Sequence, residues 1–221
     1  MTLSGTAVFE LDVTEYIEEA FERCGLEVRT GYDLKTAKRS LNLMLAEWAN
    51  RGLNQWTIQR TTVPLIVGTR EYALGAETID VLSAVVHRTG TDFAMARVSR
   101  DTDLNTPNKS TQGRPSQFFV ARSTNPVLQL WPTPENNTDV IILDRLVRMD
   151  DASSATNTVD MPFRFYPALA AGLAYYLSLK RSPQRTQLLK AVYEEEMERA
   201  MSEDRDRASL RIEPGFGYSG M

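Results

Sequence analysis

The chain has 221 residues, a formal net charge of −4 at pH 7 and a pI of about 5.2. This length allows one or two domains whose hydrophobic cores need neither disulfides nor a metal. The mildly acidic balance argues against sequence-specific nucleic-acid binding, which needs a basic surface for the phosphate backbone, although DNA can still pass loosely. The longest nearly apolar stretch, 167–179, is too short to span a bilayer, so no membrane partner is expected.

The first expected element is a helix that begins after Asp12, because Glu15 three residues later completes a capping-box pattern. Apolar residues recur behind it at helical spacing, and Gly25 ends it. Cys24 lies on the apolar stripe and is expected to pack there as a small hydrophobe. It is the only cysteine, and the chain starts without a leader pattern, so we expect a protein kept in a reducing cytoplasm.

A second helix is expected over 33–51, with Leu34, Leu41 and Trp48 on its apolar face. The short connection 26–32 would make the two helices an antiparallel αα-hairpin. The apolar faces of such a hairpin need a further partner. That partner must come from later in the chain or from a neighbouring subunit.

From about 56 to 149 the pattern changes to β-branched runs separated by Gly, Pro and Asn, which is typical of a mainly antiparallel β domain. The expected strands are 61–67, 79–87, 93–98, 117–121, 127–131 and 140–147. Residues 89–92 and 135–138 are expected to form hairpin turns. Residues 101–116 look like one long loop, and a loop of this length is uncommon unless it binds something, so we expect it to touch a neighbour.

Helical signals return after the polar stretch 150–158. Asp160 followed by Pro162 marks a start, and 165–179 is apolar on nearly every side, which predicts a buried helix. Pro167 predicts a short first turn with a kink at that residue. A last, amphipathic helix is expected to begin with Ser182 as its cap and Pro183 at its first position.

The end of the chain, 208–221, lacks helical periodicity and contains Pro214. Its apolar residues nearly alternate, which would allow one extended strand on the sheet edge of another protein; the alternative is a frayed terminus. The residues of this pattern are Leu210, Ile212, Phe216 and Tyr218.

Catalytic hypotheses find little support in the sequence. His87 is the only histidine, so histidine-rich metal sites are excluded, and a Cys24–His87 pair would have to join a helix stripe to a strand. Gly-rich phosphate loops and nucleophile-elbow motifs are absent from the sequence. Runs of carboxylates are plentiful, but a glycosidase needs two of them at a controlled separation in a cleft, and such runs are usually solvated helix faces. No cofactor is expected.

Several blocks of the sequence resemble the head-to-tail adaptor family of short-tailed bacteriophages, which is related to tail tubular protein A. The blocks are 20–26, Thr30-Gly31-Tyr32-Asp33-Leu34, 41–42, Glu47-Trp48-Ala49-Asn50-Arg51-Gly52-Leu53, Pro107-Asn108-Lys109-Ser110-Thr111 with Gly113-Arg114-Pro115, Leu130-Trp131-Pro132-Thr133-Pro134, 168–175 and 204–205. Their order and spacing over residues 10–214 carry the resemblance.

The resemblance implies a structural subunit that forms a dodecameric ring under the portal, extends the DNA channel and provides the attachment site for the tail. The implied partners are other copies of the chain, the portal protein, a tail nozzle or tail tube protein, and genomic double-stranded DNA that passes non-specifically. The implied location is the head–tail junction of the virion. Some relatives are assigned a cell-wall-cleaving activity, so a peptidoglycan hydrolase is the alternative, although no catalytic motif can be matched residue by residue.

Together, these observations predict an α+β fold: an α-helical bundle, an inserted, mainly antiparallel β domain and an extended C-terminal tail. The expected domains are 1–54, 55–150, 151–207 and 208–221. The residues expected to bind the portal are Leu210, Ile212, Pro214, Phe216 and Tyr218. Those expected to contact neighbouring subunits are Trp48, Arg51, Asn108, Lys109, Arg114 and Tyr175.

Overall fold

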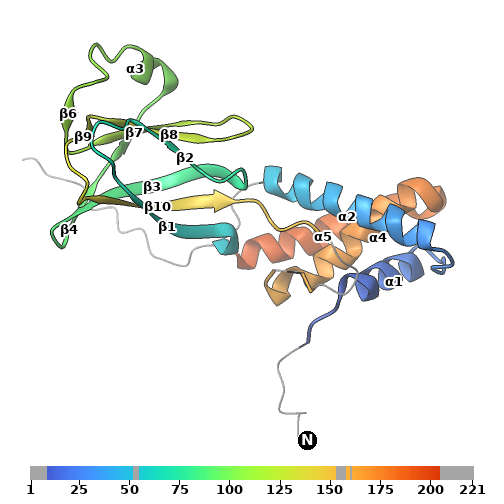
Figure 1. The fold of residues 1–221 in the computed structure, drawn as a ribbon. Coiled ribbons are helices and arrows are strands. Elements are labelled where there is room, and N and C mark those ends of the chain that lie inside the picture. The colour runs from blue at the N-terminus through green and yellow to red at the C-terminus, as the bar shows by residue number, and fades with distance from the viewer. Residues whose placement is uncertain (1–8, 52–54, 153–157, 160, 205–221) are drawn as a thin grey trace, which may run out of the picture.

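The computed structural model describes residues 9–51, 55–152, 158–159 and 161–204. These residues form an α+β structure with antiparallel-rich sheets, as predicted. Figure 1 shows an elongated molecule with most of its helices at one end and its sheets at the other. Each end has its own hydrophobic core. The helices are α1 (Val13–Arg23), α2 (Gly31–Arg51), α3 (Arg100–Leu104), α4 (Tyr166–Arg181) and α5 (Thr186–Glu203).

Helix α1 begins and ends as its sequence predicts. Asp12 accepts a hydrogen bond from the Glu15 amide at 2.8 Å, and the Glu15 carboxylate accepts one from the Asp12 amide at 2.8 Å. At the other end Gly25 has φ 72°, and the amide of Leu26 donates to the carbonyl of Phe21 at 2.9 Å. This is a Schellman ending, which requires the left-handed conformation that glycine adopts without strain.

Helix α2 begins at Gly31, two residues before the predicted start. Thr30 caps it, because its hydroxyl accepts from the Asp33 amide at 3.3 Å while the Asp33 carboxylate accepts from the Thr30 amide at 3.2 Å. The capping box therefore uses Asp in place of the usual Glu, which explains why the pattern was missed.

Helix α4 is the centre of the helical part, and α1, α2 and α5 all pack against it. It is buried on nearly every side, as predicted from its composition. Small side chains let its neighbours approach closely. The backbone of α4 lies so close to the end of α1 that the buried Cys24 thiol donates to the Ala174 carbonyl at 3.3 Å.

Two details of the C-terminal helices differ from the prediction. Pro167 lies in the first turn of α4, directly after a 3-10 turn over Phe163–Phe165, so it starts the helix and does not kink it. In this position its missing amide hydrogen is not needed. Ser182 precedes a second 3-10 turn, Pro183–Arg185, and its side chain makes no capping hydrogen bond, so α5 begins only at Thr186. The predicted start signal Asp160 lies outside the described residues.

The sheet part consists of two four-stranded sheets and a small two-stranded one. Their strands run in the orders β1-β10-β3-β4, β2-β8-β7-β5 and β6-β9. The strands are β1 (Ile58–Pro64), β2 (Glu71–Ala73), β3 (Thr78–Arg88), β4 (Thr91–Ala94), β5 (Ala96–Arg97), β6 (Gln112–Gly113), β7 (Gln117–Ala121), β8 (Val127–Trp131), β9 (Thr133–Pro134) and β10 (Val140–Val147). Among the described strands, the parallel pairs are β5 with β7 and β6 with β9, and the other pairs are antiparallel.

The bounds predicted for β7, β8 and β10 are confirmed, because buried and partly buried residues alternate along β7, β8 and the first half of β10. The predicted strand 93–98 is instead two strands in different sheets, β4 and β5, separated by the buried Met95. Buried side chains such as Phe118, Leu128 and Ile141 form the core of the sheet part.

The turn over 89–92 is a hairpin between β3 and β4, with positive φ at Thr89 and Gly90. The turn over 135–138 is not a hairpin, because it carries the chain from β9 to β10 in another sheet. The predicted loop 101–116 is also wrong as a single loop, since it contains most of α3 and all of β6. Ser99 caps α3 by accepting from the Thr102 amide at 3.1 Å.

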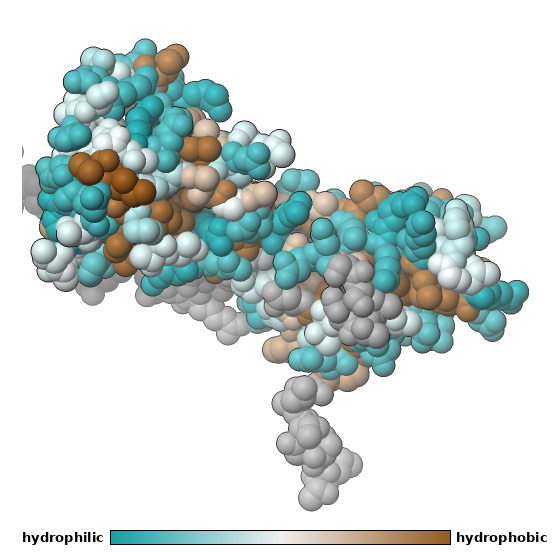
Figure 2. Space-filling model, viewed as in Figure 1, coloured by the Kyte–Doolittle hydropathy of each residue, from teal (hydrophilic) through white to brown (hydrophobic). Residues whose placement is uncertain are grey.

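None of the described helices combines the length and apolar character needed to cross a membrane. The visible face in Figure 2 is mostly polar, with scattered apolar areas on both the sheet part and the helices. Exposed large apolar residues include Phe9, Tyr32, Leu43, Ile66, Leu104 and Phe163.

Candidate functional site

The six predicted contact residues fall into two groups, one in the helical part and one in the sheet part. Trp48, Arg51 and Tyr175 come from α2 and α4 and meet around Tyr193 of α5. The other three, in the chain segment between α3 and β7, lie in the sheet part (Figure 1). The structure therefore offers two separate surfaces and no single site that joins all six.

Tyr193 is the centre of the helical group, and its ring is buried. Its hydroxyl accepts from the indole nitrogen of Trp48 at 2.7 Å and donates to the Glu47 carboxylate at 3.1 Å. The ring of Tyr175 stacks on that of Tyr193 with centroids 5.9 Å apart. Burial raises the pKa of Tyr193, so the hydroxyl stays neutral and can donate.

Arg51 closes this network at the surface. Its Nε donates to Glu47 at 2.6 Å, and its two terminal nitrogens donate to the Glu194 carboxylate at 2.8 and 3.1 Å. The guanidinium also lies 4.8 Å from the Tyr193 ring centroid. Hydrogen bonding from Arg51 lowers the pKa of Glu194, so the pair remains charged. The bidentate pair fastens α2 to α5 and leaves Trp48 buried behind it.

Sequence reasoning missed three members of this network: Glu47, Tyr193 and Glu194. Tyr193 carried a signal, because it belongs to the apolar pattern of the last helix. Glu194 belongs to a run of glutamates, and such runs are usually solvated. No local pattern indicates that it pairs with Arg51, which lies 143 positions earlier in the chain.

The second group holds the segment after α3 against β8 and β9. The carbonyl of Asn108 accepts from the Trp131 indole at 3.0 Å, and that of Lys109 accepts from the Thr133 hydroxyl at 2.9 Å. The Arg114 guanidinium lies 3.8 Å from the ring centroid of Phe93. The side chains of Asn108 and Arg114 are nevertheless exposed, so a fixed backbone presents them to solvent.

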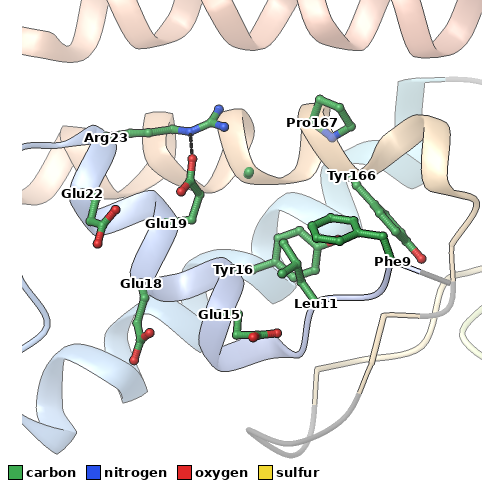
Figure 3. Close-up of a pocket in the computed structure, with 11 residues that line it drawn as sticks. Phe9, Leu11, Glu15, Tyr16, Glu18, Glu19, Glu22, Arg23, Tyr166 and Pro167 are labelled. Carbon is green, nitrogen blue, oxygen red and sulfur yellow. Dashed lines mark hydrogen bonds and ion pairs between the residues drawn. The ribbon is translucent and has the colours of Figure 1, made fainter. Parts of the chain in front are cut away.

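A groove of about 470 Å³ lies between α1 and the start of α4 (Figure 3). One end holds aromatic rings, with those of Tyr16 and Tyr166 6.0 Å apart and edge to face. Tyr16 is fully buried, and its hydroxyl has no hydrogen-bond partner among the described residues. The groove is lined by Phe9, Leu11, Glu15, Tyr16, Glu18, Glu19, Glu22, Arg23, Tyr166, Pro167 and Ala170.

The carboxylates of this groove are the ones that the hydrolase alternative would use. Glu15, Glu18 and Glu22 are exposed, and Glu19 accepts from Arg23 at 2.7 Å. A glycosidase acid is kept protonated by burial in an apolar pocket, which none of these four residues has. The groove is therefore better suited to association than to acid–base catalysis.

The other residues considered for catalysis or metal binding do not form a site among the described residues. Cys24 is buried among the helices, whereas His87 lies in the sheet part, where its Nδ1 is 2.6 Å from the Asp92 carboxylate. Across the described ranges no three metal-ligating side chains cluster as a cation site would require. The predicted portal-binding residues, Leu210 to Tyr218, lie outside the described residues.

A comparison with protein families shows which family the chain belongs to. A family model described as SU10 adaptor protein matches residues 12–215, which is nearly the whole chain. The protein is thus of the class of bacteriophage structural adaptors. The chain belongs to the SU10 adaptor protein family, a family of phage head-to-tail adaptors. No curated protein sequence matches it significantly.

Proposed function

We propose that the protein is a subunit of the ring that joins a phage head to its tail. The observation that carries this proposal is the family match over residues 12–215. In this role a dodecamer docks on the portal, extends the DNA channel and offers the tail nozzle or tail tube its attachment site. The mildly acidic chain suits this role, because a basic channel wall would hold the DNA that has to slide past it.

The two hydrophobic cores suggest that the helical part and the sheet part make different contacts in the ring. We propose that 1–54 and 151–207 form one helical bundle that contacts neighbouring copies, with Arg51 and Tyr175 near its surface and Trp48 supporting Arg51 from within. In the same proposal, the domain 55–150 presents Asn108, Lys109 and Arg114 to a neighbour. The segment 208–221 binds the portal as an added strand.

The hydrolase alternative has no observation in its favour, since the α1 carboxylates are exposed. The direct test is electron microscopy of the purified chain mixed with portal rings from the same phage, with each component alone alongside. Extra ring density stacked on the narrow end of the portal is the expected result, and it would also give the copy number. Bare portal rings with free chains in the background would contradict the proposal.

A further inference from the structure

Helix α1 presents an acidic stripe on the side that faces away from the helical core. Glu15, Glu18 and Glu22 are exposed and lie three and four residues apart, so they share one face. Glu18 and Glu22 make no ion pair with any residue that the structure describes. The opposite face, which includes Ile17 and Phe21, is buried.

Helix α2 presents the opposite charge on its outward side. Lys35 and Arg39 are exposed, and like Glu18 and Glu22 they make no ion pair within the described ranges. Tyr32 and Leu43 continue the same face and are 69% and 56% exposed. We call Tyr32, Lys35, Arg39 and Leu43 the basic stripe, and Glu15, Glu18 and Glu22 the acidic stripe.

Other exposed charges of the helical part are mostly used within the subunit. Arg51 of α2 pairs with Glu194 of α5, and Arg199 of α5 pairs with Glu195 and Glu196. Each stripe thus gathers two charges of one sign without an ion pair on one helix face, whereas Lys190 and Glu198, two exposed residues of α5 that make no ion pair within the described part of the chain, differ in sign. Each faces outward from its own helix, so they are available to another molecule.

We propose that the acidic stripe of one copy docks on the basic stripe of the next copy. Because the two surfaces differ, the contact is heterologous and repeats head to tail, which closes a ring when the rotation allows it. This inference rests on the proposed function, since it names the surfaces by which the ring subunits meet.

The groove of Figure 3 completes the contact, because it borders the acidic stripe. Phe9 at its edge is 67% exposed, so the groove offers apolar surface beside the carboxylates. An exposed apolar side chain of the basic stripe, Tyr32 or Leu43, fits such a groove. Apolar contact would then supply burial at the centre, while the charges set orientation and encounter rate.

The test uses two charge-reversed variants. In Glu18→Lys/Glu22→Lys both stripes are basic, and in Lys35→Glu/Arg39→Glu both are acidic. Each variant by itself brings like charges together and should associate at least about tenfold more weakly than the wild type at low salt. An equimolar mixture restores opposite charges at every contact, so its sedimentation coefficient should rise, and added salt should lower it again.

A matched control separates this effect from general charge attraction. Glu195→Lys/Glu198→Lys on α5 makes the same change of net charge at exposed helical positions outside both stripes. Both stripes are intact in this variant, so by itself it should associate as the wild type does. If it associates as weakly as Glu18→Lys/Glu22→Lys does, the loss follows from net charge alone and the inference is overturned.

The same proteins mixed with portal rings keep this inference distinct from the proposed function. If wild-type chain adds a ring and each reversed variant does so equally well, the adaptor role stands and the stripe contact is wrong. If wild-type chain leaves the portal bare but the reversed variants assemble only with each other, the contact stands and the adaptor role is wrong.

Discussion

At the scale of single residues, two buried tyrosines have opposite surroundings. The Tyr193 hydroxyl is bonded on both sides, by Trp48 and Glu47, whereas that of Tyr16 has no partner among the described residues. A buried hydroxyl stabilises the fold only when its hydrogen bonds are made. Their removal should therefore have different consequences.

We expect Tyr193→Phe to lower the free energy of unfolding by about 1–3 kcal/mol, because it leaves the Trp48 indole donor buried without an acceptor. Tyr16→Phe should leave that free energy unchanged or raise it by up to about 1 kcal/mol. Denaturant unfolding of both variants beside the wild type measures the two effects. Equal losses would show that the network around Tyr193 contributes nothing specific.

Asp33 makes stability depend on pH. A hydrogen bond from the Thr30 hydroxyl at 2.9 Å, together with the nearby Arg181 guanidinium, holds the pKa of Asp33 below its ordinary value. The ionised form therefore stabilises the native state above the unfolded pKa of about 4, and this contribution is lost as the pH falls through the lowered folded pKa.

The stability advantage of the wild type over Asp33→Asn should accordingly be full at neutral pH and shrink below about pH 4. Thermal unfolding across this range measures it. Arg181→Met keeps the Thr30 hydrogen bond, which is the larger cause, and should retain most of the pH dependence. An advantage of Asp33 that stays constant down to pH 2 would contradict this assignment.

At the scale of elements, the central feature is how closely α2 and α5 approach α4. A β-carbon placed at Gly172 would lie 2.5 Å from the sulfur of Met44 and 2.8 Å from the Tyr193 ring. At Gly31, the first residue of α2, it would meet nothing within 4 Å. The same substitution can therefore test packing at one site and helix propensity at the other.

We expect Gly172→Ala to destabilise the protein by about 1–3 kcal/mol through overpacking. Gly31→Ala should be neutral or stabilise by up to about 1 kcal/mol, because alanine favours the helical backbone. Calorimetric melting temperatures distinguish the two. A neutral Gly172→Ala would mean that the core between α2, α4 and α5 is looser than its contacts indicate.

At the scale of the whole molecule, the C-terminal segment is the element proposed to reach another protein. Removal of 208–221 should weaken portal binding by at least about tenfold, because a strand added to a sheet edge gains its affinity from hydrogen bonds along its backbone. Co-sedimentation with portal rings measures this. Full-length Phe216→Ser/Tyr218→Ser serves as a second variant, and wild-type binding by the truncated chain would rule the segment out.

The alternative function, peptidoglycan hydrolysis, can also be tested on the whole protein. Purified protein should release no soluble fragments from peptidoglycan at any pH between 4 and 9, because its groove carboxylates are exposed. Turbidity of a cell-wall suspension, with lysozyme as the positive control, measures this. Lysis that disappeared in Glu18→Gln/Glu22→Gln would instead show that α1 carries an active site.

Much of the fold could be predicted because its signals are local. The capping box at Asp12, the glycine after α1, the all-round apolar character of α4 and the alternation in β7, β8 and β10 each lie within a few residues of the structure they specify. Binary patterning and cap chemistry act on the backbone nearby, so they can be interpreted without knowing the partners. The resemblance to head-to-tail adaptors was likewise carried by short blocks in order, and the family match confirms it.

Only the tertiary structure decided how distant segments meet. It divides the strands between sheets at Met95, places Pro167 in the first turn of α4, and brings Trp48 to Tyr193 across 145 residues. It also leaves the acidic and basic stripes of α1 and α2 unpaired within the subunit. These features depend on packing between segments far apart in the chain. Many segments have similar apolar patterns, so the pattern of one helix or strand does not show which other segment will cover its apolar face. The amino-acid sequence by itself determined most of the elements and the family, and the packing of those elements decided which surfaces remain for assembly.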